Sequence, residues 1–348
     1  MHKYTVSIVG ARGYSGLELA KILLSHPHVE LTHCYATSSF ELFDYISHSK
    51  AKTVRCLSES DLDSNNSDIV FLATPAEVSL KIAPSLLAKG CKVIDLSGAF
   101  RLKNSDYEKW YGFKHSEPEL LKKSVYGLLP FVGPHKNQTG SCENLIANPG
   151  CYASAVSLAL IPLIKENLIF TDSLVIDAKS GTSGAGKKAA ENLLFTEVDG
   201  ECLPYKVGRH QHLPEIQEAV KQFTGIEINP HFTTSLLPVR RGITAAIYAN
   251  LREGLTLKDV DATFKKYYES NALFEIGALA RRPQLSFLKK IVGTAKTHIS
   301  YEVVGQKLFV FSVIDNLLKG AAGQAVENLN RLLDLNTNTS LTSLEAVL

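Results

Sequence analysis

The sequence has no apolar run long enough to cross a membrane and no dense block of basic residues. The apolar stretch 158–164 ends at Lys165, whereas a spanning helix needs about 18 or more apolar residues. The start, Met-His-Lys-Tyr-Thr-Val, lacks the layout of a secretory signal, because Val6 already belongs to a predicted strand. The 37 basic residues nearly cancel the 35 acidic ones, which gives no reason to expect nucleic acid or a membrane as partner. We expect a cytoplasmic globular protein.

Closely spaced cysteine pairs are also missing. Six cysteines are spread over 348 residues without a CxxC pair, whereas disulfide frameworks belong to short secreted chains and zinc sites need paired ligands. We therefore expect free thiols in a reducing compartment, most of them inert and buried, and no metal. The length predicts roughly two domains.

The first part of the chain alternates short apolar strands with helical patterns. Strands are predicted at 4–9, 29–36, 69–73, 93–96 and 144–147, and helices at 17–24 and 78–87. Such alternation indicates an α/β domain over residues 1–148 with a Rossmann-type doubly wound parallel sheet covered by helices on both faces.

After residue 149 the pattern becomes rich in β-structure. Strands are predicted within 173–178, 226–237, 243–251, 290–304 and 308–313, and a helix at 257–268. Few helices between strands indicate a mixed or antiparallel sheet in a second, α+β domain over 149–316. The helical spacing of 317–335 predicts a helix that packs back on the first domain.

Three glycines, Gly10, Gly13 and Gly16, follow the first strand directly and open the first helix. Glycines there allow a tight turn and close backbone approach, and the helix N-terminus that includes Tyr14 and Ser15 offers N–H groups to a pyrophosphate. The spacing GxxGxxG differs from the usual GxGxxG, so a plain turn is the alternative. The placement favours a dinucleotide site.

The end of the second strand bears on which dinucleotide binds. Folds that prefer NAD carry a carboxylate there for the ribose 2′-hydroxyl. Here Ser38 and Ser39 follow the strand and no carboxylate appears before Glu41. Hydroxyls tolerate a 2′-phosphate and Arg12 can supply charge, so we predict NADP(H).

Cys151 carries the strongest chemical signal. Asn148 suits a helix N-cap, Pro149 suits the first helical position, and an apolar helix runs on to Ile164. A cysteine in the first turn is favoured as a thiolate by free N–H groups and the helix dipole. A small buried structural cysteine is the alternative. Beside a nicotinamide, such a thiolate predicts attack on an activated acyl carbon and reduction of the thioester to an aldehyde.

This chemistry needs an acid/base and an anion site. His210 is the first candidate for the acid/base and His212 the second, since an imidazole can deprotonate a thiol. The alternatives are half of a metal site or ordinary surface histidines.

Arg101 is the candidate for the anion site. It follows a parallel strand, where it can hold a leaving phosphate through paired hydrogen bonds or form a surface salt bridge. The glycine-rich segment 180–186 contains Ser183 and Gly184 and allows close backbone approach; a flexible linker is the alternative. Arg240 and Arg241 either recognise a carboxylate or are solvated.

Several motifs together resemble the N-acetyl-gamma-glutamyl-phosphate reductase family and, more distantly, aspartate-semialdehyde dehydrogenases. They occur in the family's order over nearly the whole chain: GARGYSGLEL (10–19), VIDLSGAFRL (93–102), NPGCYAS (148–154), SGTSGAGKKA (180–189), KVGRHQHLPEI (206–216), LLPVRRGI (236–243) and DNLLKGAAGQAVENLN (315–330). Where that family often shows Ser-Arg-Ser after the second strand, this chain has Ser38-Ser39-Phe40.

The resemblance implies NADPH-dependent reduction of N-acetyl-L-glutamyl 5-phosphate to the 5-semialdehyde, with release of phosphate, in arginine biosynthesis. It implies Cys151 as the nucleophile and Asn316 near the nicotinamide. Arg101 resembles a phosphate-binding arginine, and Asn148 and Glu215 lie in matching segments as further substrate contacts. The resemblance also implies a homodimer or homotetramer.

Two other functions stay open from the sequence. A related aspartyl-phosphate enzyme would place its histidine in 239–245, where this chain has none. A non-catalytic NADP-binding sensor would have lost a chemical residue, yet Cys151, His210 and Arg101 are all present. The sequence leaves open which histidine faces the sulfur and which group modifies the amino nitrogen of the substrate.

Overall fold

The computed structural model describes residues 3–133 and 144–346, so the first two residues and Cys142 lie outside the described part. Two compact units divide the chain. Unit 1 comprises Met1–Pro149 with Ala321–Leu341, and unit 2 comprises Gly150–Gly320 with Thr342–Leu348.

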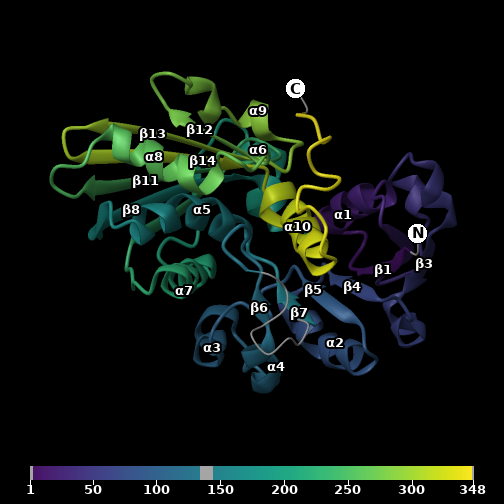
Figure 1. The fold of residues 1–348 in the computed structure, drawn as a ribbon. Coiled ribbons are helices and arrows are strands. Elements are labelled where there is room, and N and C mark those ends of the chain that lie inside the picture. The colour runs from purple at the N-terminus through teal and green to yellow at the C-terminus, as the bar shows by residue number, and fades with distance from the viewer. Residues whose placement is uncertain (1–2, 134–143, 347–348) are drawn as a thin grey trace. The chain divides into compact units, whose positions relative to one another are not determined.

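Unit 1 is built on a parallel sheet of seven strands in the order β3-β2-β1-β4-β5-β7-β6 (Figure 1). Its strands are β1 (Tyr4–Val9), β2 (Val29–Ala36), β3 (Arg55–Ser58), β4 (Ile69–Leu72), β5 (Lys92–Asp95), β6 (Val125–Tyr126) and β7 (Leu145–Ala147). The predicted Rossmann-type sheet is confirmed, and the five predicted strands match within one residue at each end. The sequence missed β3 and β6, which are too short to show a pattern.

The helices of unit 1 are α1 (Tyr14–Leu24), α2 (Ala76–Ala88), α3 (Tyr107–Tyr111), α4 (Pro118–Lys123) and α10 (Gly323–Leu332). The C-terminal helix α10 contacts α1 and β5 of this unit. The stretch predicted as one helix is interrupted, because a π-helical turn, Leu318–Ala322, precedes α10.

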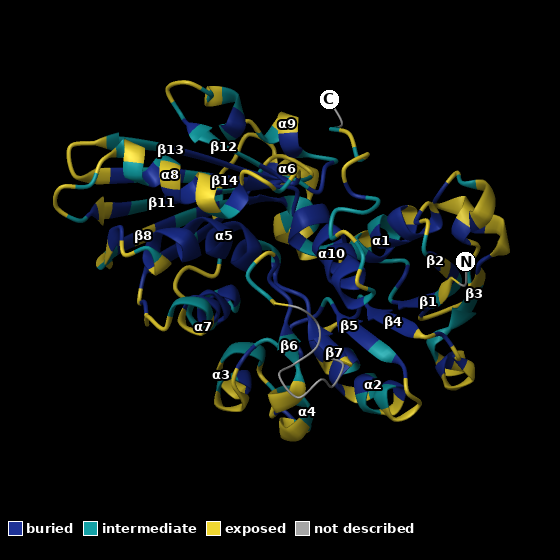
Figure 2. Ribbon diagram, in the orientation of Figure 1, coloured by how far each residue is buried: buried dark blue, intermediate teal, exposed yellow. Residues whose placement is uncertain are grey.

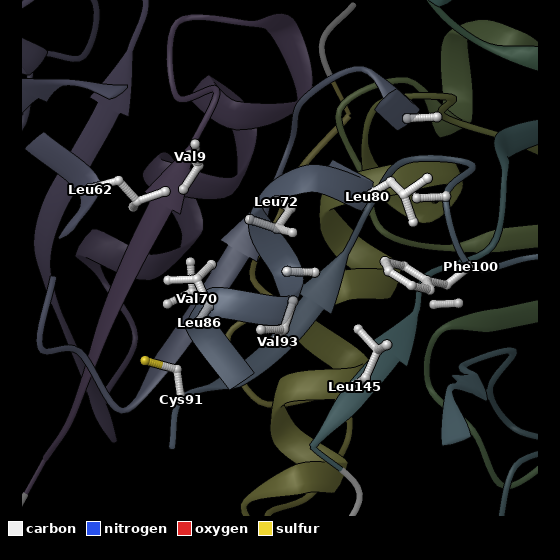
Figure 3. Packing of buried hydrophobic residues seen from close by; sticks show 14 of the residues in the cluster. Val9, Leu62, Val70, Leu72, Leu80, Leu86, Cys91, Val93, Phe100 and Leu145 are labelled. Atoms are coloured by element: carbon white, nitrogen blue, oxygen red, sulfur yellow. The ribbon is translucent and has the colours of Figure 1, made fainter. Parts of the chain in front are cut away.

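The core of unit 1 forms where helix α2 covers the sheet. Val70, Leu72 and Val93 point from β4 and β5 toward Leu80 and Leu86 of α2 (Figure 3). All four residues of β4 are fully buried. A strand buried on both faces reads as a continuous apolar run, which explains why the sequence located it so well.

Unit 2 contains a mixed sheet of seven strands in the order β12-β13-β14-β11-β8-β10-β9. Its strands are β8 (Ile169–Gly181), β9 (Leu203–Pro204), β10 (His231–Leu237), β11 (Ile243–Leu251), β12 (Phe274–Ala278), β13 (Thr297–Val304) and β14 (Lys307–Ile314), and its helices are α5 (Cys151–Lys165), α6 (Phe195–Val198), α7 (His212–Thr224), α8 (Leu257–Tyr268) and α9 (Leu288–Ile291). The predicted mixed sheet is confirmed. Strands β10 and β13 lie within the predicted β-rich segments 226–237 and 290–304, and they begin at His231 and Thr297.

Helix α5 lies in the centre of unit 2 and is almost entirely buried (Figure 2). It contacts β8, β11 and β14 as well as α7 and α8. A helix covered on all sides is apolar all round, which matches its sequence from Tyr152 to Ile164. Among the described residues, no helix is both long and apolar enough to cross a membrane.

Candidate active site

Cys151 is the first residue of helix α5. Gly150 precedes it as N-cap with extended backbone and no side-chain cap, so the first-turn N–H groups receive no capping side chain. This confirms the predicted position of Cys151 in the first turn, where the helix dipole favours a thiolate. Its side chain is partly exposed.

Asn148 does not cap the helix, so that prediction is wrong. Its side-chain amide donates to the carbonyl of Ala321 at 3.2 Å, and its Oδ1 accepts from Asn328 at 3.1 Å. These contacts belong to unit 1, where Asn148 holds the end of β7 to the C-terminal segment. A capping role was inferred from residue type and spacing alone, which do not reveal such distant partners.

Glu215 connects the start of α5 to the histidine segment. Its Oε1 accepts the N–H of Gly150 at 2.7 Å, and its Oε2 lies 3.9 Å from Nε2 of His212. The residue is 1% exposed. A buried carboxylate therefore fixes the residue before the candidate nucleophile and provides negative charge beside an imidazole.

His210 is enclosed by aromatic rings. Its ring centre lies 5.2 Å from that of Tyr152 and 5.7 Å from that of Tyr205, and its Nδ1 accepts the backbone N–H of His212 at 3.1 Å. Burial lowers the pKa of His210 to about 2, and neighbouring His212 and Lys206 act in the same direction. His210 is neutral at pH 7.

A pair of phenols also lies here, and sequence reasoning missed it. The Tyr205 hydroxyl donates to that of Tyr152 at 2.9 Å. Burial raises the pKa of Tyr205 to about 12 and that of Tyr152 further, and the charge of Cys151 adds to both effects. Both phenols keep their protons at neutral pH. The only available signal was that Tyr152 follows Cys151 directly.

The structure brings Ser183 and Gly184 of the glycine-rich segment 180–186 next to Asn316, which sequence reasoning considered separately. The Asn316 amide donates to Ser183 Oγ at 3.0 Å, and its Oδ1 accepts the N–H of Gly242 at 2.7 Å. A Cβ on Gly184 would lie 3.2 Å from the Ser180 hydroxyl. The segment is thus a fixed loop rather than a flexible linker.

Asp315, which the sequence reasoning missed, organises the same region. Its fully buried carboxylate lies 2.9 Å from an NH2 group of Arg241 and accepts the N–H groups of Gly293, Leu317 and Leu318. Arg241 is therefore ion-paired within the protein, so of the two alternatives left open by the sequence the solvated one is wrong. The carboxylate it meets is internal.

The glycine turn of unit 1 requires glycine at its first and last positions. Gly10 has φ of +82°, and a Cβ there would lie 2.4 Å from the carbonyl of Ala73. A Cβ on Gly16 would lie 2.5 Å from the carbonyl of Gly10. The N–H of Gly13 closes the turn on that carbonyl at 3.1 Å. At Gly10 and Gly16 the backbone is thus packed too closely for a side chain.

The residues around this turn fit a dinucleotide. Helix α1 starts at Tyr14 without a capping side chain and has no acidic residue in its first turn, which leaves a favourable site for a phosphate. Arg12 donates to Ser38 Oγ at 3.0 Å and lies 5.9 Å above the Phe40 ring. The positively charged Arg12 guanidinium therefore lies at the end of β2, where NAD-specific folds carry a carboxylate.

Arg101 lies at the carboxyl edge of the parallel sheet. Its Nε donates to the carbonyl of Asn148 at 2.8 Å and an NH2 group to that of Leu96 at 2.6 Å. The buried carboxylate of Asp95 accepts hydrogen bonds from the N–H and the hydroxyl of Ser97 and so fixes the loop between Asp95 and Arg101. Backbone contacts orient the guanidinium at the edge where ligands bind in such sheets. In the described ranges, no three His, Cys, Asp or Glu side chains form a group that could hold a metal.

Family models match both parts of the chain. Residues 5–139 match the NAD-binding domain of semialdehyde dehydrogenases, and residues 151–316 match their dimerisation domain. The chain is 40% identical over 340 residues to an N-acetyl-gamma-glutamyl-phosphate reductase of Campylobacter jejuni subsp. doylei, covering 97% of this chain and 98% of that protein. It is 41% identical over 335 residues to the protein of that name from Geobacillus thermodenitrificans, covering 94% and 95%.

Known structures share the fold. Aspartate semialdehyde dehydrogenase II of Vibrio cholerae superposes with a TM-score of 0.71 at 20% identity, covering 96% of this chain and 99% of that one. The enzyme of Candida albicans with NADP gives 0.66 at 16% identity, covering 97% and 100%. The chain therefore belongs to the semialdehyde dehydrogenase family, in the group of the N-acetyl-gamma-glutamyl-phosphate reductases.

Proposed function

We propose that the protein reduces N-acetyl-L-glutamyl 5-phosphate to N-acetyl-L-glutamate 5-semialdehyde with NADPH, releasing phosphate, as a step of arginine biosynthesis in the cytoplasm. One observation carries this proposal. Cys151 is the first residue of the buried helix α5, and the Glu215 carboxylate accepts the N–H of the preceding Gly150 and also lies beside His212.

Cys151 forms the covalent bond to the substrate. Its sulfur attacks the acyl carbon, the bond from that carbon to the phosphate oxygen breaks, and phosphate leaves. The thiol proton passes to an imidazole. When bound, NADPH supplies the hydride that turns the thioester into the aldehyde. Addition of hydride leaves a tetrahedral carbon that is still bound to the Cys151 sulfur and carries an oxyanion. When this oxyanion reforms the carbonyl, the carbon–sulfur bond breaks, the aldehyde is released and the Cys151 thiolate is regenerated.

The two histidines have different surroundings. His210, the candidate favoured from the sequence, is held neutral by burial, and its Nδ1 is occupied by the N–H of His212. His212 has the Glu215 carboxylate 3.9 Å away, which stabilises a protonated imidazole. We assign proton transfer to His212 and the orientation of that ring to His210.

Each unit holds part of the ligand-binding residues. We assign the dinucleotide-binding domain to unit 1 and the catalytic and oligomerisation domain to unit 2. In unit 1 the dinucleotide contacts are Gly10, Arg12, Gly13, Tyr14, Ser15, Gly16, Ser38 and Ser39, and the phosphate contacts are Arg101 and Asn148. In unit 2 the further contacts are Ser183, Gly184 and Asn316 for the dinucleotide and Glu215 for the substrate.

We infer that the protein forms a homodimer or homotetramer through the sheet of unit 2. Val175, Tyr248 and Phe309 are register partners across three neighbouring strands and therefore share one face. None of them is buried, whereas Ile176 and Ile247, the register pair next to Val175 and Tyr248, are buried at 0% and 1% exposure. An apolar, solvated row in a domain matched as a dimerisation domain suits a second copy of the chain. Light scattering that shows only monomer would contradict this.

The decisive experiment follows NADPH formation from N-acetyl-glutamate semialdehyde, phosphate and NADP. Wild type should be active, and Cys151→Ser should lose several orders of magnitude. The matched control is Cys202→Ser, which removes an exposed thiol. Activity that survives in Cys151→Ser would exclude the covalent mechanism. Preference for aspartate semialdehyde would favour the related aspartyl-phosphate enzyme, and no turnover with tight NADPH binding would favour a sensor.

A further inference from the structure

Two cysteines outside the candidate active site lie side by side in unit 1. Cys34 of β2 and Cys56 of β3 are direct register partners in neighbouring parallel strands, and the Cys56 thiol donates to the carbonyl of Val54 at 3.7 Å. Neighbouring strands are about 4.8 Å apart, within the Cα–Cα range of roughly 4.4–6.8 Å that a disulfide spans. Because β3 is a four-residue strand at the edge of the sheet, it has room to adjust.

The two thiols differ in exposure and acidity. Cys34 is fully buried, whereas Cys56 is partly exposed. The hydrogen bond from Cys34, together with the N–H of Leu42, lowers the pKa of Cys56. The same hydrogen bond, together with burial, raises the pKa of Cys34 well above its ordinary value. Cys56 is therefore the nucleophile of the pair, and Cys34, its register partner on the neighbouring strand, is the resolving thiol.

We propose that Cys34 and Cys56 are a modification site, at which a peroxide converts the two thiols into a disulfide. In the first step the Cys56 thiolate attacks hydrogen peroxide, the O–O bond breaks, and a sulfenic acid and hydroxide form. In the second step the Cys34 sulfur attacks the Cys56 sulfur, the S–O bond breaks, and the hydroxyl group leaves as water with the Cys34 proton. The two thiols lose two electrons, which the peroxide gains.

The pair is connected to the loop that follows β2. Leu42, whose backbone N–H contributes to the lowered pKa of Cys56, begins the short helical turn Leu42–Asp44. The preceding residues include Ser38 and Phe40, both of which contact Arg12. Disulfide formation moves the Cys56 sulfur away from the Leu42 N–H and the Val54 carbonyl, so the loop is less firmly held. This effect on coenzyme binding depends on the dinucleotide site proposed above, whereas the disulfide itself does not.

The experiment uses the full chain carrying Cys151→Ser, which removes the competing nucleophile. Hydrogen peroxide is added, remaining thiols are blocked with iodoacetamide in denaturant so that buried Cys34 is also reached, and the digested protein is mapped without reduction. We expect a linked peptide containing Cys34 and Cys56, and NADPH binding, followed by fluorescence, that is about threefold to tenfold weaker, as expected when a hydrogen bond is lost. Dithiothreitol should restore both.

Three added variants separate the steps. Cys56→Ser should abolish the linked peptide and the change in affinity. Cys34→Ala should stop at the Cys56 sulfenic acid, which dimedone traps. The matched control Cys91→Ser should change neither result, because that thiol contacts the Asn65 amide.

Three results are decisive. Two fully alkylated thiols after peroxide, or Cys56 oxidised alone, would overturn the modification site. A linked peptide with unchanged NADPH affinity would overturn the effect on the loop. Absence of NADPH binding before peroxide would refute the proposed dinucleotide site, while the linked peptide would still decide the disulfide.

Discussion

Glu215→Gln is the substitution that best isolates the role of charge in the candidate active site. The amide keeps an oxygen that can accept the Gly150 N–H but removes the negative charge 3.9 Å from the His212 ring. At an effective dielectric constant of about 20, two unit charges at that distance attract by about 4 kcal/mol before the cost of desolvation is subtracted. Both side chains are nearly inaccessible to water, so salt screens this attraction little.

We expect kcat/KM for Glu215→Gln to fall by roughly 100- to 1,000-fold, which lies within the range that general acid–base catalysis contributes. The assay is NADPH formation from the semialdehyde and phosphate across pH. The limb of the profile that reports the protonated imidazole should move to lower pH, because the cation has lost its anionic neighbour.

The control for this experiment is Glu218→Gln, three residues further along the same helix, with unfolding by urea measured for both variants. A structural role alone would lower stability without moving the pH profile. If Glu215→Gln retained activity within about twofold and an unchanged profile, the assignment of Glu215 and His212 to proton transfer would be wrong.

Three further predictions concern stability and the coenzyme. Burial lowers the pKa of His210 to about 2 and that of His298 to about 4. Because the unfolded chain binds protons at these histidines more readily, the free energy of unfolding should be constant above about pH 6.5 and fall toward pH 4 and below. Urea titrations should show a less steep fall in His210→Asn. Asp315→Asn should lower the free energy of unfolding of unit 2 by about 2–4 kcal/mol, because a buried ion pair and charge-assisted backbone hydrogen bonds are lost. The control Asp172→Asn, at an exposed position, should leave the free energy of unfolding in urea nearly unchanged. Arg12→Ser should weaken NADPH binding about tenfold and leave NADH binding nearly unchanged in fluorescence titrations; equal losses for both coenzymes would refute a contact to the 2′-phosphate.

The sequence predicted those parts of the molecule that depend on local patterns. Buried parallel strands such as β4 are continuous apolar runs, and Cys151 follows a motif that starts a helix. Short strands carry too little pattern, so β3 was missed, and with it the register that pairs Cys34 with Cys56.

Contacts between distant residues were the second limit of the sequence. Asn148 has the residue type and position typical of an N-cap, but its hydrogen-bond partners are Ala321 and Asn328, more than 170 positions away. The relation of His210 to His212 depends in the same way on Glu215 and on two phenols that no spacing rule selects. Residue type thus predicts which chemistry is available, whereas tertiary packing decides what each side chain contacts.

Buried carboxylates at three loops show how that packing fixes the site. Asp95 accepts the N–H of Ser97, Glu215 accepts that of Gly150, and Asp315 accepts three backbone N–H groups. Each is at most 1% exposed, and a hydrogen bond to a charged group contributes about 1.5–3 kcal/mol, more than one between neutral groups. These bonds hold backbone rather than side chains, so they position the residues that follow without occupying their functional atoms. The same arrangement makes the loops sensitive to neutral substitutions of their carboxylates, and the Glu215→Gln and Asp315→Asn experiments test that sensitivity at two independent points.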